Sequence, residues 1–131
     1  MKPGTTIRIA RPTDNLGKIV SMYRDGLEFV ALGSFEDHDG FDGVILGHPG
    51  QNYHLEFTSH KDHTAGSAPT RDNLLVFYIR DSIEWELQCR KMTKAGFVKV
   101  DSFNPYWDKI GKTFEDVDGY RVVLQNSGWE E

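Results

Sequence analysis

The chain has 131 residues, of which 38% are hydrophobic and 27% charged, which is ordinary for one globular domain. Its formal net charge is −5 with both signs interspersed, so no basic stripe invites nucleic acid. No stretch approaches a membrane span and the N-terminal segment lacks a signal-peptide core, so we expect a cytoplasmic protein without membrane partners. Cys89 is the single cysteine, which excludes an internal disulfide and a cysteine metal cluster.

The first half of the chain is predicted to form a strand, a helix and three strands. Four apolar residues recur at the spacing of one buried helical stripe: Leu16, Ile19, Val20 and Tyr23. Thr13 or Asp14 would cap this helix at its start, and Gly26 would end it. Strands are predicted at residues 7–12, 27–36, 44–47 and 52–59.

The second half repeats this order. A helix is expected at 81–96, with Asp81 and Glu84 at capping-box spacing and Gly96 as its stop. Three of its residues share the face expected to pack in the core: Trp85, Cys89 and Met92. Strands are predicted at residues 74–80, 97–103, 112–116 and 120–125. The last two would form a hairpin around Asp118-Gly119.

These elements predict an α+β fold built from two βαβββ modules. Module one covers residues 5–60 and module two covers 72–126, joined by a polar linker at 61–71 that is rich in Ser, Gly and Pro. A helix on one face of each sheet leaves the opposite faces free to enclose a cavity.

Three stretches, in this order, resemble motifs of the vicinal oxygen chelate superfamily, which includes glyoxalase I, bleomycin-resistance proteins, fosfomycin-resistance enzymes and extradiol dioxygenases. "NLGKIVSMYRDGLEF" (15–29) is similar to the first helix of that superfamily, and "YHLEFTS" (53–59) to the strand that closes its first module. "FEDVDGYRVVLQ" (114–125) is similar to its "F.DPDGN..EL" hairpin, with Val117 where proline is usual. The resemblance covers nearly the whole chain and implies a curled sheet in each module around a shared cavity.

Metal-dependent members of that superfamily place His, Gln or Glu at four equivalent strand positions. By the resemblance, these positions fall at Arg8, Glu56, Leu74 and Val123, so only Glu56 keeps a metal-ligating side chain. A divalent metal needs several converging oxygen or nitrogen donors, and a guanidinium would repel it. We therefore expect no metal ligand set and no cofactor.

By the resemblance, Arg8, Glu56 and Val123 face the cavity. Strand alternation adds His54, Tyr78 and Arg121, and Trp107 lies in a loop of the kind that often covers a ligand site. Arg8 and Glu56 would either pair with each other or leave Arg8 to bind an anionic group of a ligand. Trp107 would either cover the site or plug the edge of a sheet. If the protein is catalytic, His54 and Glu56 are the best candidates for a base.

A histidine-rich stretch, "HLEFTSHKDH" (54–63), offers an alternative metal site. His60 or His63 could fold back toward His54 and Glu56, or the segment from His60 could simply begin a solvated loop. We prefer the loop, because no ligand from the second module stands at the expected positions.

The sequence thus predicts a metal-independent protein that binds a small organic molecule, as in the bleomycin-resistance branch. One alternative is a metal-dependent glyoxalase-like lyase or isomerase, or a dioxygenase. The other is a dimerisation module without a ligand. A homodimer is implied by the resemblance, because small two-module members commonly build their cavities from both subunits.

Overall fold

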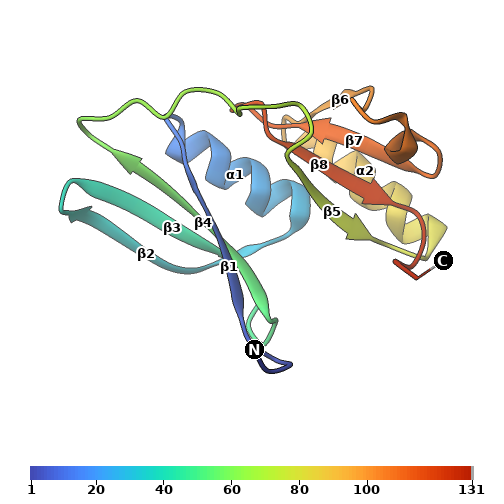
Figure 1. Ribbon diagram of the computed structural model, residues 1–131, viewed down its shortest axis with the longest axis horizontal. Coiled ribbons are helices and arrows are strands. Elements are labelled where there is room, and N and C mark those ends of the chain that lie inside the picture. Colours follow the sequence, from blue (N-terminus) through green and yellow to red (C-terminus); the bar gives the residue numbers. More distant parts are fainter. Residues whose placement is uncertain (131) are drawn as a thin grey trace.

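The computed structural model describes residues 1–130 and contains two four-stranded sheets, each with one helix (Figure 1). The first module consists of β1 (Ile7–Pro12), α1 (Leu16–Leu27), β2 (Val30–His38), β3 (Phe41–Gly47) and β4 (Tyr53–His60). The second consists of β5 (Leu74–Tyr78), α2 (Ser82–Lys94), β6 (Val98–Val100), the 3₁₀ helix η1 (Pro105–Asp108), β7 (Gly111–Glu115) and β8 (Arg121–Gln125).

Both sheets have the same topology. The orders are β1-β4-β3-β2 and β5-β8-β7-β6, and in each the first strand runs parallel to the last while the other pairs are antiparallel. The predicted α+β fold with two βαβββ modules is therefore confirmed. Its division at residues 5–60, 61–71 and 72–126 stays an interpretation.

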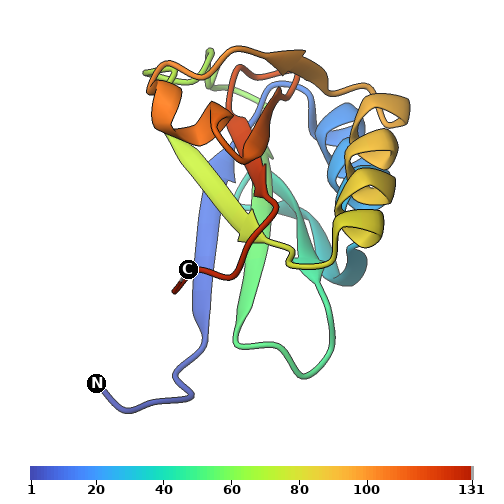
Figure 2. The same ribbon diagram turned by 90° about the vertical axis from the view of Figure 1, so that its right-hand side faces the viewer.

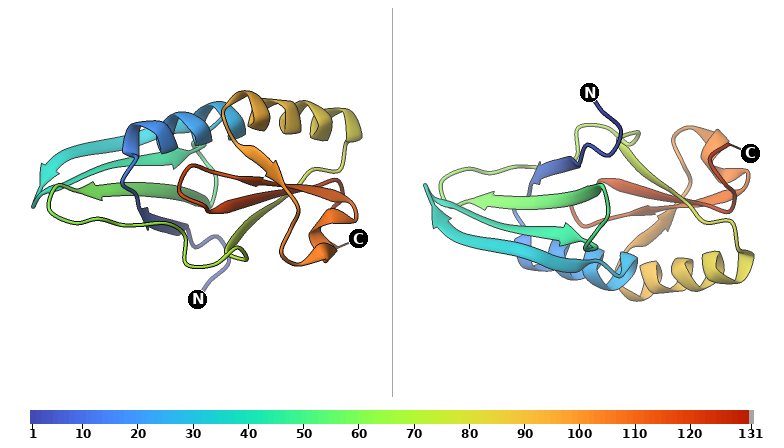
Figure 3. Two further views of the ribbon diagram at one scale, coloured as in Figure 1. Left: turned by 90° about the horizontal axis from the view of Figure 1, so that it is seen from above. Right: turned by 90° about the horizontal axis from the view of Figure 1, so that it is seen from below.

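The helices lie on the same side of the two sheets. Figure 2 shows both helices beside the strands, and Figure 3 shows α1 and α2 following one another along one side of the molecule. They contact each other, and near the end of α1 the side chain of Gln88 in α2 donates a hydrogen bond to the carbonyl oxygen of Gly26. None of the helices within residues 1–130 is long and apolar enough to cross a membrane. The cytoplasmic location stays a prediction.

One continuous core fills the space between the helices and the sheets. The predicted stripes are confirmed: Ile19 and Tyr23 of α1, and Cys89 and Met92 of α2, are buried in it. The sheets contribute apolar residues from alternate positions, which are Leu46, Leu55, Phe57, Phe114, Val122 and Leu124. The opposite face of each sheet is thus left for other contacts.

The ends of α1 differ from the prediction. Asn15 precedes the helix, and Asp14 instead accepts hydrogen bonds from the backbone N–H groups of Ala65 and Gly66, at 2.7 and 2.9 Å. Gly26 lies within the helix, which ends at Leu27, and Glu28 adopts the left-handed conformation.

Gly26 is needed for packing rather than for chain reversal. A Cβ atom there would lie 2.9 Å from Phe97 and 3.1 Å from Met92, so the missing side chain lets α1 approach the second module. At the other helix, Asp81 caps α2 as predicted by accepting a 2.8 Å hydrogen bond from the N–H of Glu84.

Most predicted strands have slightly different bounds, and two of these differences have a clear structural cause. The strand predicted at 97–103 is only three residues long, β6, because the chain turns away after it toward η1. The strand predicted at 27–36 begins at Val30, since the helix continues through Leu27.

The hairpin between β7 and β8 holds the two modules together through buried carboxylates. Asp116 accepts a 2.7 Å hydrogen bond from the Tyr23 hydroxyl of α1. Asp118 accepts hydrogen bonds from the hydroxyl of Thr13 at 2.6 Å and from the amide of Asn15 at 2.9 Å. The hairpin thus joins the second module to the start and the middle of the first helix.

Burial shifts the pKa values of both Asp116 and Tyr23. It raises the pKa of Asp116 above its usual range, while hydrogen bonds from Tyr23 and from the N–H groups of Asp118 and Tyr120 act in the opposite direction. The pKa of Tyr23 is also raised, first by burial and then by the charge of Asp116.

We predict opposite effects for alanine at two glycines of α1. Gly26→Ala should lower the free energy of unfolding by about 1 kcal/mol, because overpacking against Phe97 outweighs the gain in helix propensity. Gly17→Ala is the matched control: nothing lies within 4 Å of its added Cβ, so it should be neutral or stabilising by up to about 1 kcal/mol. Chemical denaturation followed by circular dichroism measures both. Equal gains would contradict the close contact.

Tyr23→Phe should lower the free energy of unfolding by about 1–3 kcal/mol at neutral pH, because it leaves a buried carboxylate oxygen of Asp116 unpaired. The substitution raises the folded-state pKa of Asp116 further. A raised pKa gives stability below the unfolded value that is lost as the pH rises through the folded value, so the defect should shrink in acid. Denaturation at about pH 7.5 and about pH 4.5 tests this. A defect of the same size at both would mean that Asp116 is not the group affected.

Candidate functional site

The candidate site of the first module lies on the face of its sheet that points away from α1. Parallel pairing of β1 with β4 places Arg8 opposite His54 and Ala10 opposite Glu56. Alternation puts Arg8, His54 and Glu56 on one face, whereas their neighbours Ile9 and Leu55 pack against the core. Three of the predicted site residues are therefore brought together by two adjacent strands.

Arg8 binds both of its neighbours. Its Nε donates to Nε2 of His54 at 2.8 Å, and its Nη1 donates to Oε2 of Glu56 at 3.2 Å. Because Nε2 of His54 accepts this bond, the proton of the neutral imidazole stands on Nδ1. The ion pair with Glu56, one of the two alternatives for Arg8, is present in the single chain, and the bond to His54 is an addition that spacing alone did not predict.

This ion pair is open to solvent on one side. The Arg8 side chain is 47% exposed and that of Glu56 is 16% exposed. Nη2 of Arg8 makes no hydrogen bond to residues 1–130, so its N–H groups are free to donate to a ligand. The arrangement offers N–H donors beside a carboxylate that is already partly neutralised.

These residues do not fit a divalent metal. The two potential ligands, His54 and Glu56, both accept hydrogen bonds from a cation that stands between them. Within residues 1–130, no three side chains of the types His, Cys, Asp and Glu gather closely enough to hold a metal ion. The expectation of a metal-free site rests on this donor set and stays a prediction.

The histidine-rich stretch forms a separate cluster at the end of β4. Nδ1 of His60 accepts from the N–H of Asp62 at 3.1 Å, so its Nε2 carries the proton and lies 3.2 Å from the carbonyl oxygen of Asp39. The His63 ring packs against that of His60 with centroids 4.5 Å apart. Both ring nitrogens of His60 are therefore engaged locally, which favours the loop interpretation.

In the second module, Arg121 forms a buried ion pair, whereas Arg8 of the first module is half exposed. Arg121 is almost fully buried, and its Nε donates to Glu115 at 2.9 Å while its Nη1 donates to the carbonyl oxygen of Asp101 at 3.2 Å. Val123, next on the same face, has no exposed surface. Neither is presented to solvent in the single chain.

The two remaining predicted residues lie at the periphery. Tyr78 ends β5 and is 43% exposed. Trp107 belongs to η1, where its ring packs edge-on against Tyr106 at 5.0 Å. A ligand role for Tyr78, Trp107, Arg121 and Val123 stays a prediction.

Sequence reasoning missed two features of this second face. Glu115 lies directly opposite Arg121 in the β7–β8 register, which the Asp118-Gly119 turn could have indicated by counting outward from it. The side-chain oxygen Oε1 of Gln125 is buried without a hydrogen-bond partner among the described residues, close to Gly111. No sequence signal distinguishes this glutamine.

We predict that the two arginines differ in their contribution to stability. Arg8→Met should change the free energy of unfolding by less than about 1 kcal/mol, because its ion pair is half exposed. Arg121→Met should cost about 2–3 kcal/mol, because it leaves Glu115 and a backbone carbonyl without their buried partner. Both variants keep an apolar side chain of similar length. Chemical denaturation of the two variants therefore compares what each guanidinium contributes to the free energy of unfolding. A larger loss for Arg8 would make it a structural residue.

Comparisons with known proteins match each half of the chain to a family model. Residues 7–58 match the YycE-like N-terminal domain and residues 72–126 match the YycE-like C-terminal domain. The Bacillus subtilis (strain 168) protein YycE is 44% identical over 121 residues, which are 92% of this chain and 87% of that protein.

Solved structures extend this likeness. A crystal structure of YycE from Bacillus subtilis, a protein of unknown function for which glyoxalase or fosfomycin resistance has been suggested, has a TM-score of 0.87 at 44% identity and covers 95% of this chain and 91% of that one. Two more distant structures share the fold. Glyoxalase I of Leishmania major, described as trypanothione-dependent, has a TM-score of 0.69 at 17% identity, over 92% and 85% of the two chains.

The other is a mutant of the fosfomycin resistance protein FosX of Listeria monocytogenes, in complex with Mn(II) and 1S,2S-dihydroxypropylphosphonic acid. Its TM-score is 0.72 at 16% identity, over 99% of this chain and 97% of that one.

Proposed function

Because the chain belongs to the YycE-like family, within the vicinal oxygen chelate superfamily, we propose that it binds a small organic anion without a metal, using Arg8 as the recognition group. The proposal is one of binding; it assigns no reaction. The observation that carries it is the position of one guanidinium between His54 and Glu56.

The chemistry of Arg8 supports an anionic ligand. A guanidinium presents its donors in a fixed plane, so a free Nη2 can donate charge-assisted hydrogen bonds to a carboxylate or a phosphonate. His54 and Glu56 hold this plane in place and leave Nη2 free. They act as positioning residues, since a ligand that contacts Nη2 need not touch either of them.

The same donor set disfavours the metal-dependent alternative. A divalent ion would need His54 and Glu56 to exchange their bonds to Arg8 for bonds to the metal, and Arg8 would then face the ion as a like charge. FosX in complex with Mn(II) shares the fold at 16% identity, and this likeness does not show that the metal ligands of FosX are present in this chain. Lyase, isomerase or dioxygenase chemistry through a metal therefore becomes the outcome that would overturn the proposal.

We further propose that two copies of the chain complete the site. Arg8 is 47% exposed on the open face of its sheet, and a site for a small organic molecule normally encloses most of its ligand. A second copy could cover this face. Light scattering coupled to size exclusion should therefore give twice the monomer mass, and a monomer would limit the site to an open surface.

The ligand prediction uses metal-stripped, untagged protein. Its thermal midpoint should not rise with Ni, Zn, Mn, Fe or Mg ions, and should rise saturably with small carboxylates or phosphonates. Elemental analysis of the protein as purified is the companion measurement. Stoichiometric metal, or a saturable shift with one of these ions, would contradict the proposal and favour the enzyme.

The control for this experiment is a pair of arginine variants. Arg8→Ala should abolish the response to anions, whereas Arg24→Ala should keep it, because Arg24 is an exposed helix residue whose one ion pair within residues 1–130 is with its neighbour Asp25. An equal response in both variants would remove Arg8 from the site.

A further inference from the structure

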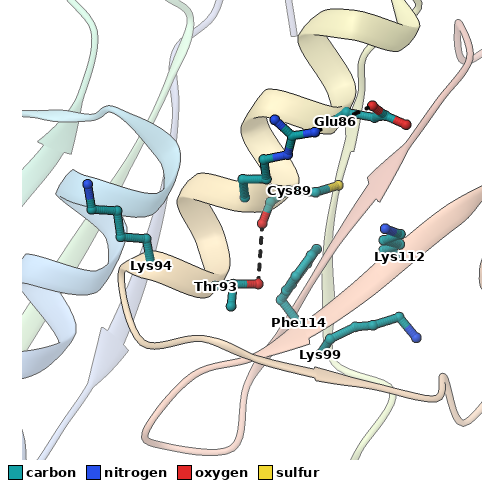
Figure 4. A pocket seen from close by; sticks show the side chains of 8 residues that line it. Glu86, Cys89, Thr93, Lys94, Lys99, Lys112 and Phe114 are labelled. Carbon is teal, nitrogen blue, oxygen red and sulfur yellow. Dashed lines mark hydrogen bonds and ion pairs between the residues drawn. The ribbon is translucent and has the colours of Figure 1, made fainter.

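A surface pocket, called here the helix-side hollow, lies on the helix side of the second module. It is on the other face of the sheet from Arg121 and Val123. It measures about 490 Å³ and opens between α2 and the strands β6 and β7 (Figure 4). Its lining consists of Glu86, Cys89, Arg90, Thr93, Lys94, Lys99, Lys112 and Phe114. The volume is in the range of pockets that hold small organic ligands.

Regular secondary structure places these side chains. The helix residues recur three or four positions apart and so share one face of α2. On the sheet, Lys99 pairs with Phe114 in the β6–β7 register, and Lys112 lies two residues before Phe114. All three strand residues therefore point to the side of the sheet that carries the helix.

Positive charge is concentrated in this hollow. Four cations, Arg90, Lys94, Lys99 and Lys112, line it together with one carboxylate, Glu86, although the whole chain carries a net charge of −5. Within residues 1–130 the one ion pair of this group joins Arg90 and Glu86, at 4.0 Å.

The three lysines have no carboxylate at ion-pair distance among the described residues. Lys112 lies instead over the ring of Trp85, 5.2 Å from its centroid. Lys94 stands at the rim and also borders a neighbouring hollow beside α1. Lys99 and Lys112 are thus the two cations that the strands present to this hollow.

The floor of the hollow is apolar. In Figure 4, the Cys89 thiol and the Phe114 ring lie between α2 and the two strand lysines. Both residues are almost fully buried, at 6% and 1% exposure. A ligand here would meet an apolar floor and a cationic rim.

We propose that this hollow is a second ligand site, which binds a small amphipathic anion. The anionic head would contact Lys99, Lys112 and Arg90, and the apolar body would lie over Cys89 and Phe114. This site is independent of the Arg8 site, which lies on the other module.

Charge and shape both favour a small ligand. A nucleic acid or an anionic membrane needs an extended basic surface, and the rest of this chain is acidic. Inorganic phosphate alone would leave the apolar floor exposed. The head can be a carboxylate or a phosphate, because lysine binds both as a point charge.

Cys89 provides a local reporter, since it is the single cysteine and lies in the floor. Burial raises the pKa of its thiol, so alkylation by N-ethylmaleimide is followed at mildly alkaline pH on the full chain. Octanoate and octyl phosphate should each slow alkylation several-fold, with saturation. Octanol and inorganic phosphate at the same concentrations should leave the rate unchanged.

Two double variants with the same change of charge test the assignment. Lys99→Gln with Lys112→Gln should raise the half-protecting concentration of octanoate by about tenfold or more, because two charge-assisted contacts are lost. Lys2→Gln with Lys109→Gln removes two exposed lysines outside the hollow and should leave that concentration unchanged. The half-protecting concentration is compared, because Lys112 itself affects the reactivity of Cys89.

The outcomes separate this site from the first. Protection that survives in Arg8→Ala, and is lost in the Lys99 and Lys112 variant, supports the second site whether or not Arg8 binds ligand. Absence of protection, equal protection by octanol, or equal loss in the control variant would each overturn it.

Discussion

The fold depends on a small group of buried carboxylates in the β7–β8 hairpin. A carboxylate removed from water is costly unless its oxygens are bonded, and here Tyr23 satisfies Asp116 while Thr13 and Asn15 satisfy Asp118. These bonds are long-range in sequence, so they form only when the second module sits correctly on the first helix. They fix how the second module sits against α1 and against the residues that lead into it from β1.

Local signals determined most of the architecture, and non-local packing determined the remainder. Alternation and helical spacing predicted each strand and both helices, and Asp118-Gly119 located the last hairpin. Gly26 misled the prediction because a glycine near a helix end is read as a stop, whereas this one admits Phe97 from another segment. Asp14 misled it likewise, since its partners lie some fifty residues away.

The site was predictable to the extent that it depends on strand pairing. The resemblance placed Arg8 and Glu56 on one cavity face, and the parallel register of β1 with β4 brings them together with His54. Burial of Arg121 was not predictable, because it depends on Glu115 and on a backbone carbonyl supplied by the chain after β6. The basic hollow was also beyond sequence reasoning, since its cations come from a helix and two strands.

The arginines on the open sheet faces have carboxylate partners, whereas the lysines of the helix-side hollow do not among the described residues. Arg8 and Arg121 each face a carboxylate on their own sheet, so burying or half-burying them is compensated. The lysines of the helix-side hollow have no carboxylate at ion-pair distance among the described residues, although the chain as a whole is acidic. A bound anion, as proposed above, would supply the partner that these residues do not.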